Sequence, residues 1–335
     1  MAHRDILAIG TSAGGFDALR FLAGEFQRDF PASILVVIHL PSQFRSTLDA
    51  ILTQAGPLPA TFAVDGEKFE KSHIYIAPPG RHLLVVSEEL RLGSGPRENN
   101  TRPALDPLFR SAGLCCGPRT IGAVLTGTLG DGAAGLLALK QCGGITVVQD
   151  PGDAAFPEMP TTALTLSQPD HVVSLAGMPA LFADLVRRPV GQPVPATEAI
   201  AYEVDIAGGR RGSMSEMDRT GRRSLFACPD CHGVMWEMNE GELVRYRCHV
   251  GHAYSAELMS LALDENLARA LGSALRALDE RTAIARKLER QATDAGRTRI
   301  ATSWADRARE LEGEAKIIRD SARRTDELAA RFAAE

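Results

Sequence analysis

Through residues 4–187, short apolar runs alternate with turns rich in glycine and proline. The runs that predict strands cover residues 6–9, 34–38, 74–77, 83–86, 121–125 and 145–148. Most are apolar at every position, so we expect both faces of the sheet to be covered. Stretches with helical spacing lie between several of them, at 16–26, 46–54, 103–114 and 133–141. This alternation predicts an α/β fold with a doubly wound, mostly parallel, Rossmann-like three-layer sheet. The runs at 83–86 and 90–92 suggest a local hairpin, which would make the sheet mixed.

The pattern changes after residue 187. Residues 188–224 contain several prolines and a Gly-Gly-Arg-Arg-Gly stretch, which predict a flexible linker. Residues 225–255 hold three of the six cysteines and predict a small module. Residues 256–335 lack proline, and their apolar positions recur at three- and four-residue steps. A turn near 293–296 divides this last region, so we expect a helical hairpin there.

Composition and charge narrow the classes of function. The chain has 335 residues and a net charge of −5, which excludes a chain-wide basic surface, so no nucleic-acid partner is expected. No apolar run reaches the roughly 18 residues that cross a bilayer, so we expect no membrane insertion. The chain enters its first predicted strand without a signal-peptide pattern, and six cysteines are too few for a disulfide scaffold. These features predict a cytoplasmic protein.

Three of the predicted strands end in polar residues that can act together. Ser12 lies in a glycine-rich turn at 10–15, His39 follows the second strand, and Asp131 lies in the turn at 126–132. The carboxyl ends of parallel strands share one edge of a sheet, which is where such folds bind ligands. A hydroxyl nucleophile needs a base, and the base needs an orienting carboxylate. The pattern therefore predicts a Ser12–His39–Asp131 triad.

Each of these residues also has a plainer interpretation. The turn at 10–15 resembles a phosphate-binding loop, although its glycines fit neither G-x-G-x-x-G nor a Walker A loop. His39 can be a structural histidine, and Asp131 can cap the helix that follows it. Spacing alone leaves these alternatives open.

Residues 4–187 resemble the catalytic domain of the chemotaxis protein-glutamate methylesterase (CheB) family. The resemblance covers a little over half the chain and rests on the stretches at 10–15, 39–41, 75–80, 108–112, 126–133, 149–151 and 159–160. It implies a serine hydrolase with Ser12 as nucleophile, His39 as base and Asp131 as the orienting carboxylate, without a catalytic cofactor. The implied substrates are γ-glutamyl methyl esters on chemoreceptors or receptor-like helical proteins, with glutamate and methanol as products. Some members of the family also deamidate glutamine.

The sequence departs from the family pattern in three respects. Ala13 and Phe16 replace the usual threonine and proline, and Thr128-Leu129 replaces Met-Gly. The family's N-terminal receiver domain is expected to be absent, because the first predicted strand begins near residue 5. These departures keep an alternative function open, in which the fold is a catalytically weak or inactive signalling adaptor that acts through its C-terminal half.

The late cysteines are spaced as metal ligands. Cys228 and Cys231 form a Cys-x₂-Cys pair, and Cys248 follows after sixteen residues. His252 is a better fourth ligand than His249, because His249 directly follows Cys248 and adjacent residues rarely reach one tetrahedral centre. We expect short strands at 234–237 and 244–247 and a structural Zn²⁺ bound by Cys228, Cys231, Cys248 and His252. A redox Cys-x-x-Cys pair is the alternative, but it leaves Cys248 and His252 unexplained.

This module resembles a small metal-knuckle extension of some stand-alone methylesterase homologues, from which no function follows. The helices after it mix charges of both signs around an apolar seam. They predict a homodimer, or docking to a helical partner, through that seam.

Overall fold

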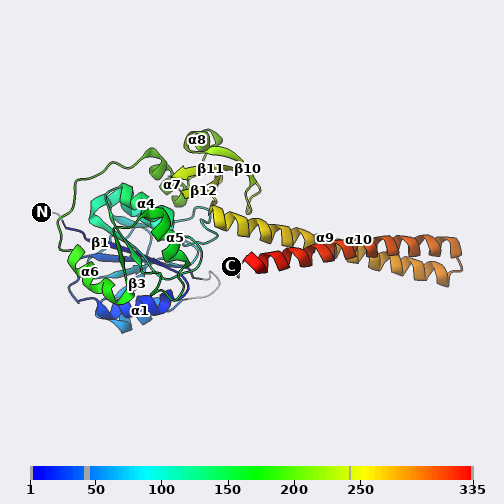
Figure 1. Cartoon of the computed structure of the whole chain (residues 1–335), viewed down its shortest axis with the longest axis horizontal. Helices are drawn as coiled ribbons and strands as arrows, with labels where there is room; N and C mark the ends of the chain where they lie inside the picture. Colours follow the sequence, from blue (N-terminus) through cyan, green and yellow to red (C-terminus); the bar gives the residue numbers. More distant parts are fainter. Residues whose placement is uncertain (1–2, 41–45, 241–242, 333–335) are drawn as a thin grey trace. The chain divides into compact units, whose positions relative to one another are not determined.

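The computed structural model describes residues 3–40, 46–240 and 243–332. The chain divides into two compact units, Met1–Leu258 and Met259–Glu335. Pro41, which belongs to one of the motifs discussed above, lies outside the described residues. The first unit contains the sheet with its helices and the cysteine module (Figure 1).

The described part of the first unit is built around a seven-stranded sheet. In spatial order its strands are β3 (Ala60–Phe62), β4 (Ile74–Ile76), β2 (Ser33–Ile38), β1 (Ile6–Thr11), β7 (Thr120–Val124), β8 (Ile145–Gln149) and β9 (His171–Val173). Every neighbouring pair is parallel. The strand order reverses on the two sides of β1, so the sheet is doubly wound as predicted and has its topological switch point at β1.

Helices cover both faces of the sheet because successive residues of a strand point to opposite faces. Leu7 and Ile9 of β1 pack into one core with α1 (Gly15–Glu25), α2 (Leu48–Ala55) and α6 (Met178–Leu185). Ile6 and Ala8 pack into a second core with α3 (Leu105–Cys116), α4 (Ala133–Gln141) and α5 (Glu158–Ser167). Figure 1 shows α1 and α4 on opposite sides of the sheet. The short 3₁₀ helices η1 (Gly117–Arg119) and η2 (Leu175–Gly177) complete this part.

The predicted hairpin forms, but outside the main sheet. Strands β5 (His82–Val86) and β6 (Glu89–Gly93) pair with each other as a separate antiparallel sheet. Their apolar side chains pack into the core that contains α3, and the Val85 N–H donates to Ser111 Oγ of that helix at 3.1 Å. The expectation of a mixed sheet is therefore not met among the described strands.

The stretch expected to be a flexible linker contains two helices, α7 (Glu198–Gly208) and α8 (Met214–Thr220). Thr197 caps α7 by accepting a hydrogen bond from the Ile200 N–H, and Ser213 and Glu216 form a capping box on α8. Ile206 and other apolar residues of α7 are buried. The prolines and glycines of this stretch lie outside the two helices or at their ends, so they mark the helix boundaries and do not form a flexible linker.

The cysteine module is a four-stranded antiparallel sheet in the described residues. Its strands are β10 (Arg222–Ala227), β11 (Val234–Glu240), β12 (Leu243–Cys248) and β13 (Ala253–Ser255). The two predicted strands correspond to parts of β11 and β12. Trp236 of β11 is fully buried and packs against Tyr202 and Ile206 of α7. The module therefore shares a core with α7.

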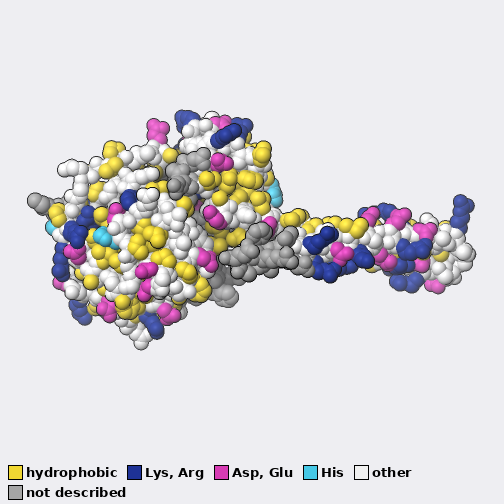
Figure 2. Space-filling model, in the orientation of Figure 1, with side chains coloured by type: hydrophobic (Ala, Val, Ile, Leu, Met, Phe, Trp, Pro, Cys, Tyr) yellow, Lys and Arg dark blue, Asp and Glu magenta, His cyan; other side chains and the backbone are white. Residues whose placement is uncertain are grey.

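The second unit is the predicted helical hairpin, with α9 (Ala256–Asp294) beginning just before the unit boundary and α10 (Thr298–Phe332) following it. The two helices are joined at Gly296, whose φ of +68° is left-handed. Ala285, Ala308 and Leu311 form its buried seam, while charges of both signs line the surface (Figure 2). None of the helices in the described ranges combines the length and apolar composition that a bilayer crossing requires.

Candidate active site and metal site

The carboxyl ends of β1 and β7 hold Ser12 in place. The Ser12 N–H donates to the Thr126 carbonyl at 3.1 Å, and Thr11 Oγ1 donates to the same oxygen at 2.7 Å. Gly127 permits the close approach of the two strands, since a Cβ there would lie 2.9 Å from Ser12 Cβ. Gly14, the N-cap residue of α1, has a φ of +74° and lies two residues after Ser12. The turn thus presents the hydroxyl beside the N-terminus of a helix.

His39 makes one hydrogen bond with each of its ring nitrogens. Its Nδ1 lies 3.0 Å from Ser12 Oγ, and its Nε2 lies 2.8 Å from Asp131 Oδ2. A carboxylate only accepts, so Nε2 carries the proton and Nδ1 can accept the Ser12 hydroxyl. The structure therefore brings all three predicted triad residues together, from strand ends far apart in the sequence.

Asp131 is buried, with each carboxylate oxygen accepting two hydrogen bonds. Oδ2 accepts from His39 Nε2 and from the Leu105 N–H at 2.7 Å, while Oδ1 accepts from Asn99 Nδ2 at 2.9 Å and from the Asp106 N–H at 3.4 Å. Burial by itself raises the pKa of Asp131, but the contacts from His39, Leu105 and Asn99 outweigh it and hold the pKa below the ordinary 3.8. The carboxylate accepts from the first N–H groups of α3, whereas the plainer interpretation had it capping α4, the helix that follows it.

Asn99 and Asp106 also belong to this site, although no sequence motif pointed to them. Asn99 Nδ2 donates to both Asp131 Oδ1 and Asp106 Oδ2, the latter at 3.0 Å. Burial and the negative charge of Asp131 raise the pKa of Asp106 from 3.8 to about 7. Asn99 adopts a left-handed φ of +50°, which asparagine tolerates better than most residues. An Asn-Asn pair between two predicted elements signals a turn, but nothing in it indicates contact with a residue 32 positions later.

The altered third motif also has a structural consequence. Leu129, which stands where the family pattern has glycine, adopts a left-handed φ of +68°. Such a conformation costs a residue with a side chain roughly 1–2 kcal/mol. Its N–H donates to Glu158 Oε2 at 2.8 Å, which helps to fix it. The leucine side chain is exposed, so the substitution adds an apolar group to the turn that carries Asp131.

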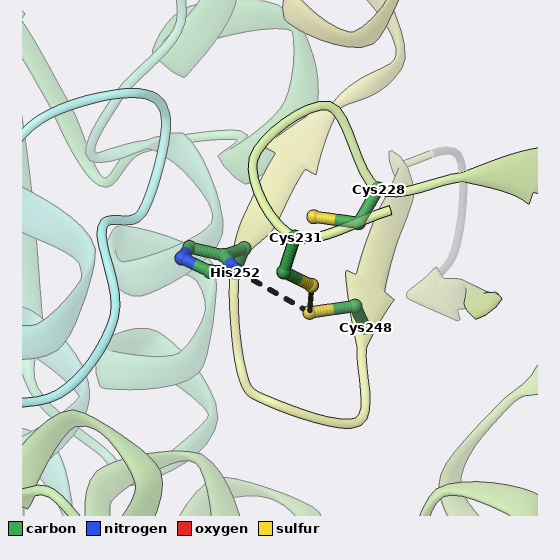
Figure 3. A group of neighbouring side chains, drawn as sticks. All are labelled: Cys228, Cys231, Cys248 and His252. Carbon is green, nitrogen blue, oxygen red and sulfur yellow. Dashed lines mark hydrogen bonds between the residues drawn. The ribbon is translucent and has the colours of Figure 1, made fainter. Parts of the chain in front are cut away.

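The predicted metal ligands cluster in the module. The ligand atoms of Cys228, Cys231, Cys248 and His252 all lie within 4.8 Å of one another (Figure 3). Cys231 Sγ lies 3.7 Å from Cys248 Sγ, which in turn lies 3.5 Å from His252 Nδ1. In a tetrahedral zinc site, bond lengths of about 2.3 Å to sulfur and about 2.05 Å to nitrogen give ligand separations of about 3.8 and 3.6 Å. These four residues can therefore hold a metal ion.

Two tight turns position the ligands. The His232 N–H donates to the Cys228 carbonyl at 2.9 Å in one, and the Gly251 N–H donates to the Cys248 carbonyl at 2.9 Å in the other. Gly251 has a φ of +114°, which favours glycine strongly. His249 is outside the group: its ring packs against Gly233, where a Cβ would come within 2.7 Å of His249 Cε1.

A doubly wound sheet that carries hydrogen-bonded serine, histidine and acid residues at its carboxyl edge has the geometry of a serine hydrolase. Residues 7–182 match the CheB methylesterase family, and the chain belongs to that family. This confirms the resemblance inferred from the motifs.

Curated methylesterases are similar to the same half of the chain. A "protein-glutamate methylesterase/protein-glutamine glutaminase 1" of Xanthomonas euvesicatoria pv. vesicatoria is 37% identical over 174 residues, 51% of this chain and 48% of the relative. A "protein-glutamate methylesterase/protein-glutamine glutaminase 2" of Methanosarcina mazei is 34% identical over 192 residues, 55% of this chain and 52% of the relative. The chain thus spans about half the length of these curated relatives. The crystal structure of the Thermotoga maritima CheB methylesterase catalytic domain superposes with a TM-score of 0.53 and 30% identity, covering 55% of this chain and all of that domain.

Proposed function

We propose that this protein is a protein-glutamate methylesterase that hydrolyses γ-glutamyl methyl esters through Ser12. The observation that carries the proposal is the hydrogen-bonded series from Ser12 Oγ through His39 to Asp131, at 3.0 and 2.8 Å, in a chain of the CheB family. The substrate class comes from the names of the relatives, so it is part of the proposal.

The geometry supports acyl transfer in two halves. His39 Nδ1 takes the Ser12 proton while Oγ attacks the ester carbonyl, and the proton then passes to the leaving methoxide, which departs as methanol. A water molecule attacks the acyl-enzyme, gives its proton to Nδ1 and releases glutamate as Ser12 regains its proton. Asp131 keeps the Nε2–H tautomer and stabilises the imidazolium that forms in each half. With glutamine as substrate, the same steps release ammonia.

The start of α1 can stabilise the oxyanion. The backbone N–H groups of Ala13 and Gly14 donate to no acceptor within the described ranges, and they follow Ser12 directly. A helix N-terminus favours negative charge, and one oxyanion donor contributes on the order of 10²–10³-fold to kcat.

The proposed partner is a methylated chemoreceptor or a receptor-like helical protein that presents the ester to this edge. Dimerisation through α9 and α10 stays a prediction, which the molar mass of the full chain in solution would test.

A structural Zn²⁺ at Cys228, Cys231, Cys248 and His252 is the second part of the proposal. The ligand separations support it, and four protein ligands leave no open coordination position for a substrate. When bound, the ion would tie the two turns of the module together. Purified protein should contain one zinc per chain by elemental analysis, and Cys228→Ser should lose it, whereas Cys142→Ser, at a buried thiol outside the group, should retain it.

Labelling by a serine-reactive fluorophosphonate tests the catalytic proposal. The parent should be labelled at Ser12 and should release methanol from methylated receptor, while Ser12→Ala should do neither. An unlabelled parent that releases no methanol would instead favour the signalling adaptor. The nucleotide-binding alternative predicts that ATP, GTP or NAD raises the melting temperature, and a flat response would dispose of it.

A further inference from the structure

The segment that follows His252, the last proposed metal ligand, is hydrogen-bonded to the turn that contains Asn99, beside the triad. Ala253, the residue after His252, accepts a hydrogen bond from the Asn99 N–H at 2.8 Å and donates its own N–H to the Arg97 carbonyl at 3.4 Å. Two residues further, the Ser255 N–H donates to Asn99 Oδ1 at 3.2 Å. Strand β13 of the module thus holds both the backbone and the side chain of Asn99.

The other end of the Asn99 amide contacts the proposed catalytic machinery. Nδ2 donates to Asp131 Oδ1 and to Asp106 Oδ2, so the amide is fixed in one orientation, with its oxygen toward Ser255 and its nitrogen toward the carboxylates. Asn99 is only 4% exposed, so water cannot easily replace these partners. A single side chain therefore connects the module to the acid that orients His39.

A buried charged contact pins the neighbouring residues of both segments. Arg247, which precedes Cys248, donates from NH1 to the Gly251 carbonyl at 2.9 Å and lies with NH2 3.2 Å from Glu98 Oε2. Glu98 precedes Asn99, and both side chains of this ion pair are almost fully buried. The turn with Cys248 and His252 is thereby joined to the preceding turn at two successive residues, Glu98 and Asn99.

We propose that Asn99 is a positioning residue for Asp131, and that the metal-loaded module holds it there, so that the metal site supports hydrolysis without touching the substrate. This inference rests on the proposed function. An ion bound by Cys248 and His252 fixes the path of the chain into Ala253 and Ser255. Without it, Asn99 loses its anchors, and Asp131 loses one of its four donors. A hydrogen bond to a charged group is worth about 10- to 100-fold in an equilibrium or a rate, which sets the expected effect.

The test combines metal removal with substitution in the full chain. Parent and Asn99→Gly are each prepared with Zn²⁺ and after chelation, and the rate of Ser12 labelling and the kcat and KM for a small activated ester are measured. Glycine suits the left-handed backbone, so the variant removes the amide without strain. Asn100→Gly is the matched control, because Asn100 is also left-handed, at φ +61°, but exposed.

Chelation should slow labelling of the parent by about 10- to 100-fold. Zinc-loaded Asn99→Gly should be labelled more slowly by the same factor, and its ester hydrolysis should show the loss in kcat and not in KM. Chelation of Asn99→Gly should add less than about twofold, since two perturbations of one connection are not additive. Hydrogen–deuterium exchange in residues 97–101 should rise on chelation of the parent. Asn99→Asp keeps an acceptor for the Ser255 N–H but loses the donor, so it should label slowly while this segment stays protected. Asn100→Gly should match the parent.

Several results would overturn the inference. A loaded Asn99→Gly with the kcat of the parent would refute the positioning role, even if chelation unfolds the module. Equal effects of chelation on parent and Asn99→Gly would show that the connection does not run through Asn99. If the parent is not labelled at Ser12, the proposed function fails instead, and exchange in residues 97–101 still tests whether the module holds this segment.

Discussion

The buried charges between the module and α3 give a prediction that does not depend on the activity. Glu203 of α7 is 2% exposed and contacts three arginines: Oε2 lies 3.0 Å from Arg110 and 3.3 Å from Arg247, and Oε1 lies 3.0 Å from Arg245. With Glu98, the cluster contains two carboxylates and three guanidiniums, so Glu203→Gln raises its formal charge from +1 to +2. Breaking a buried ion pair by removing one partner costs about 3–5 kcal/mol. For a unit of this size, that corresponds to a fall of roughly 6–20 °C in Tm.

The effect of Glu203→Gln on the free energy of unfolding should also depend on pH, in a direction that the pKa of Glu203 fixes. Burial by itself raises the pKa of Glu203, but Arg110, Arg245 and Arg247 outweigh it and hold the pKa well below the ordinary 4.5. A carboxyl whose pKa is lowered in the folded state contributes its full stability above the unfolded pKa and loses it as pH falls toward the folded value. The difference in unfolding free energy between parent and Glu203→Gln should therefore be constant from neutral pH to about 5 and shrink below about 4.5.

Trp236 provides the assay, because it is buried against α7 in the module. The chain has two tryptophans, so a Trp304→Phe background leaves Trp236 as the only reporter. Urea unfolding followed by its fluorescence should reveal the lost stability. Glu198→Gln is the control, since it makes the same change at an exposed position on the same helix. Surface substitutions normally change the free energy of unfolding by no more than about 0.5 kcal/mol, so a Glu203→Gln value within that margin of the control variant would refute the reasoning.

Three further changes test the site and the hairpin. Gly127→Ala should slow Ser12 labelling by at least about tenfold at unchanged helix content, because the new Cβ would lie 2.9 Å from Ser12 Cβ and 2.2 Å from Met159 Sδ; unchanged labelling would contradict this geometry. Asp131→Asn should lower kcat by about 10⁴-fold through the wrong imidazole tautomer, measured as methanol release, and a loss below about tenfold would exclude Asp131 as the orienting acid. Leu311→Ala should destabilise the hairpin by about 2–4 kcal/mol in thermal melts followed by circular dichroism, with Ile317→Ala, at an exposed position of the same helix, as the control. Equal melting of these last two variants would argue against a seam at Leu311.

The parallel sheet could be predicted because its strands are buried on both faces and read as unbroken apolar runs. β1, β2 and β7 lie within one residue of their expected ranges at most ends. The short edge strands β3 and β9 were not predicted, since three residues carry too little pattern. The hairpin β5–β6 was recognised, but the sequence does not say that it packs on α3 instead of joining the sheet.

The residues of the site also fall into two groups, those that the sequence predicts and those that it does not. Ser12, His39 and Asp131 stand at strand ends, so the topology that brings strand ends together also predicts their proximity. Asn99, Asp106 and Glu203 come from a turn and from the starts or interiors of helices, and their partners are set by tertiary packing. The Ser-x-x-Glu signature of a capping box at 213–216 indicates the start of α8, but the Gly-Gly-Arg-Arg-Gly stretch directly before it favoured the interpretation as a linker.

The buried cluster of two glutamates and three arginines also bears on where the chain can be truncated. Its members are Glu98, Glu203, Arg110, Arg245 and Arg247. The family match ends at residue 182, yet a fragment that stops there would keep the Arg110–Glu98 ion pair while losing its further partners, Glu203 of α7 and Arg247 of β12. Such a fragment would carry Ser12, His39 and Asp131, but it would lack the contacts from Ala253 and Ser255 that hold Asn99. We therefore expect a fragment of residues 1–258, the first compact unit, to be more stable than a fragment of residues 1–182, because it keeps the partners of this buried cluster.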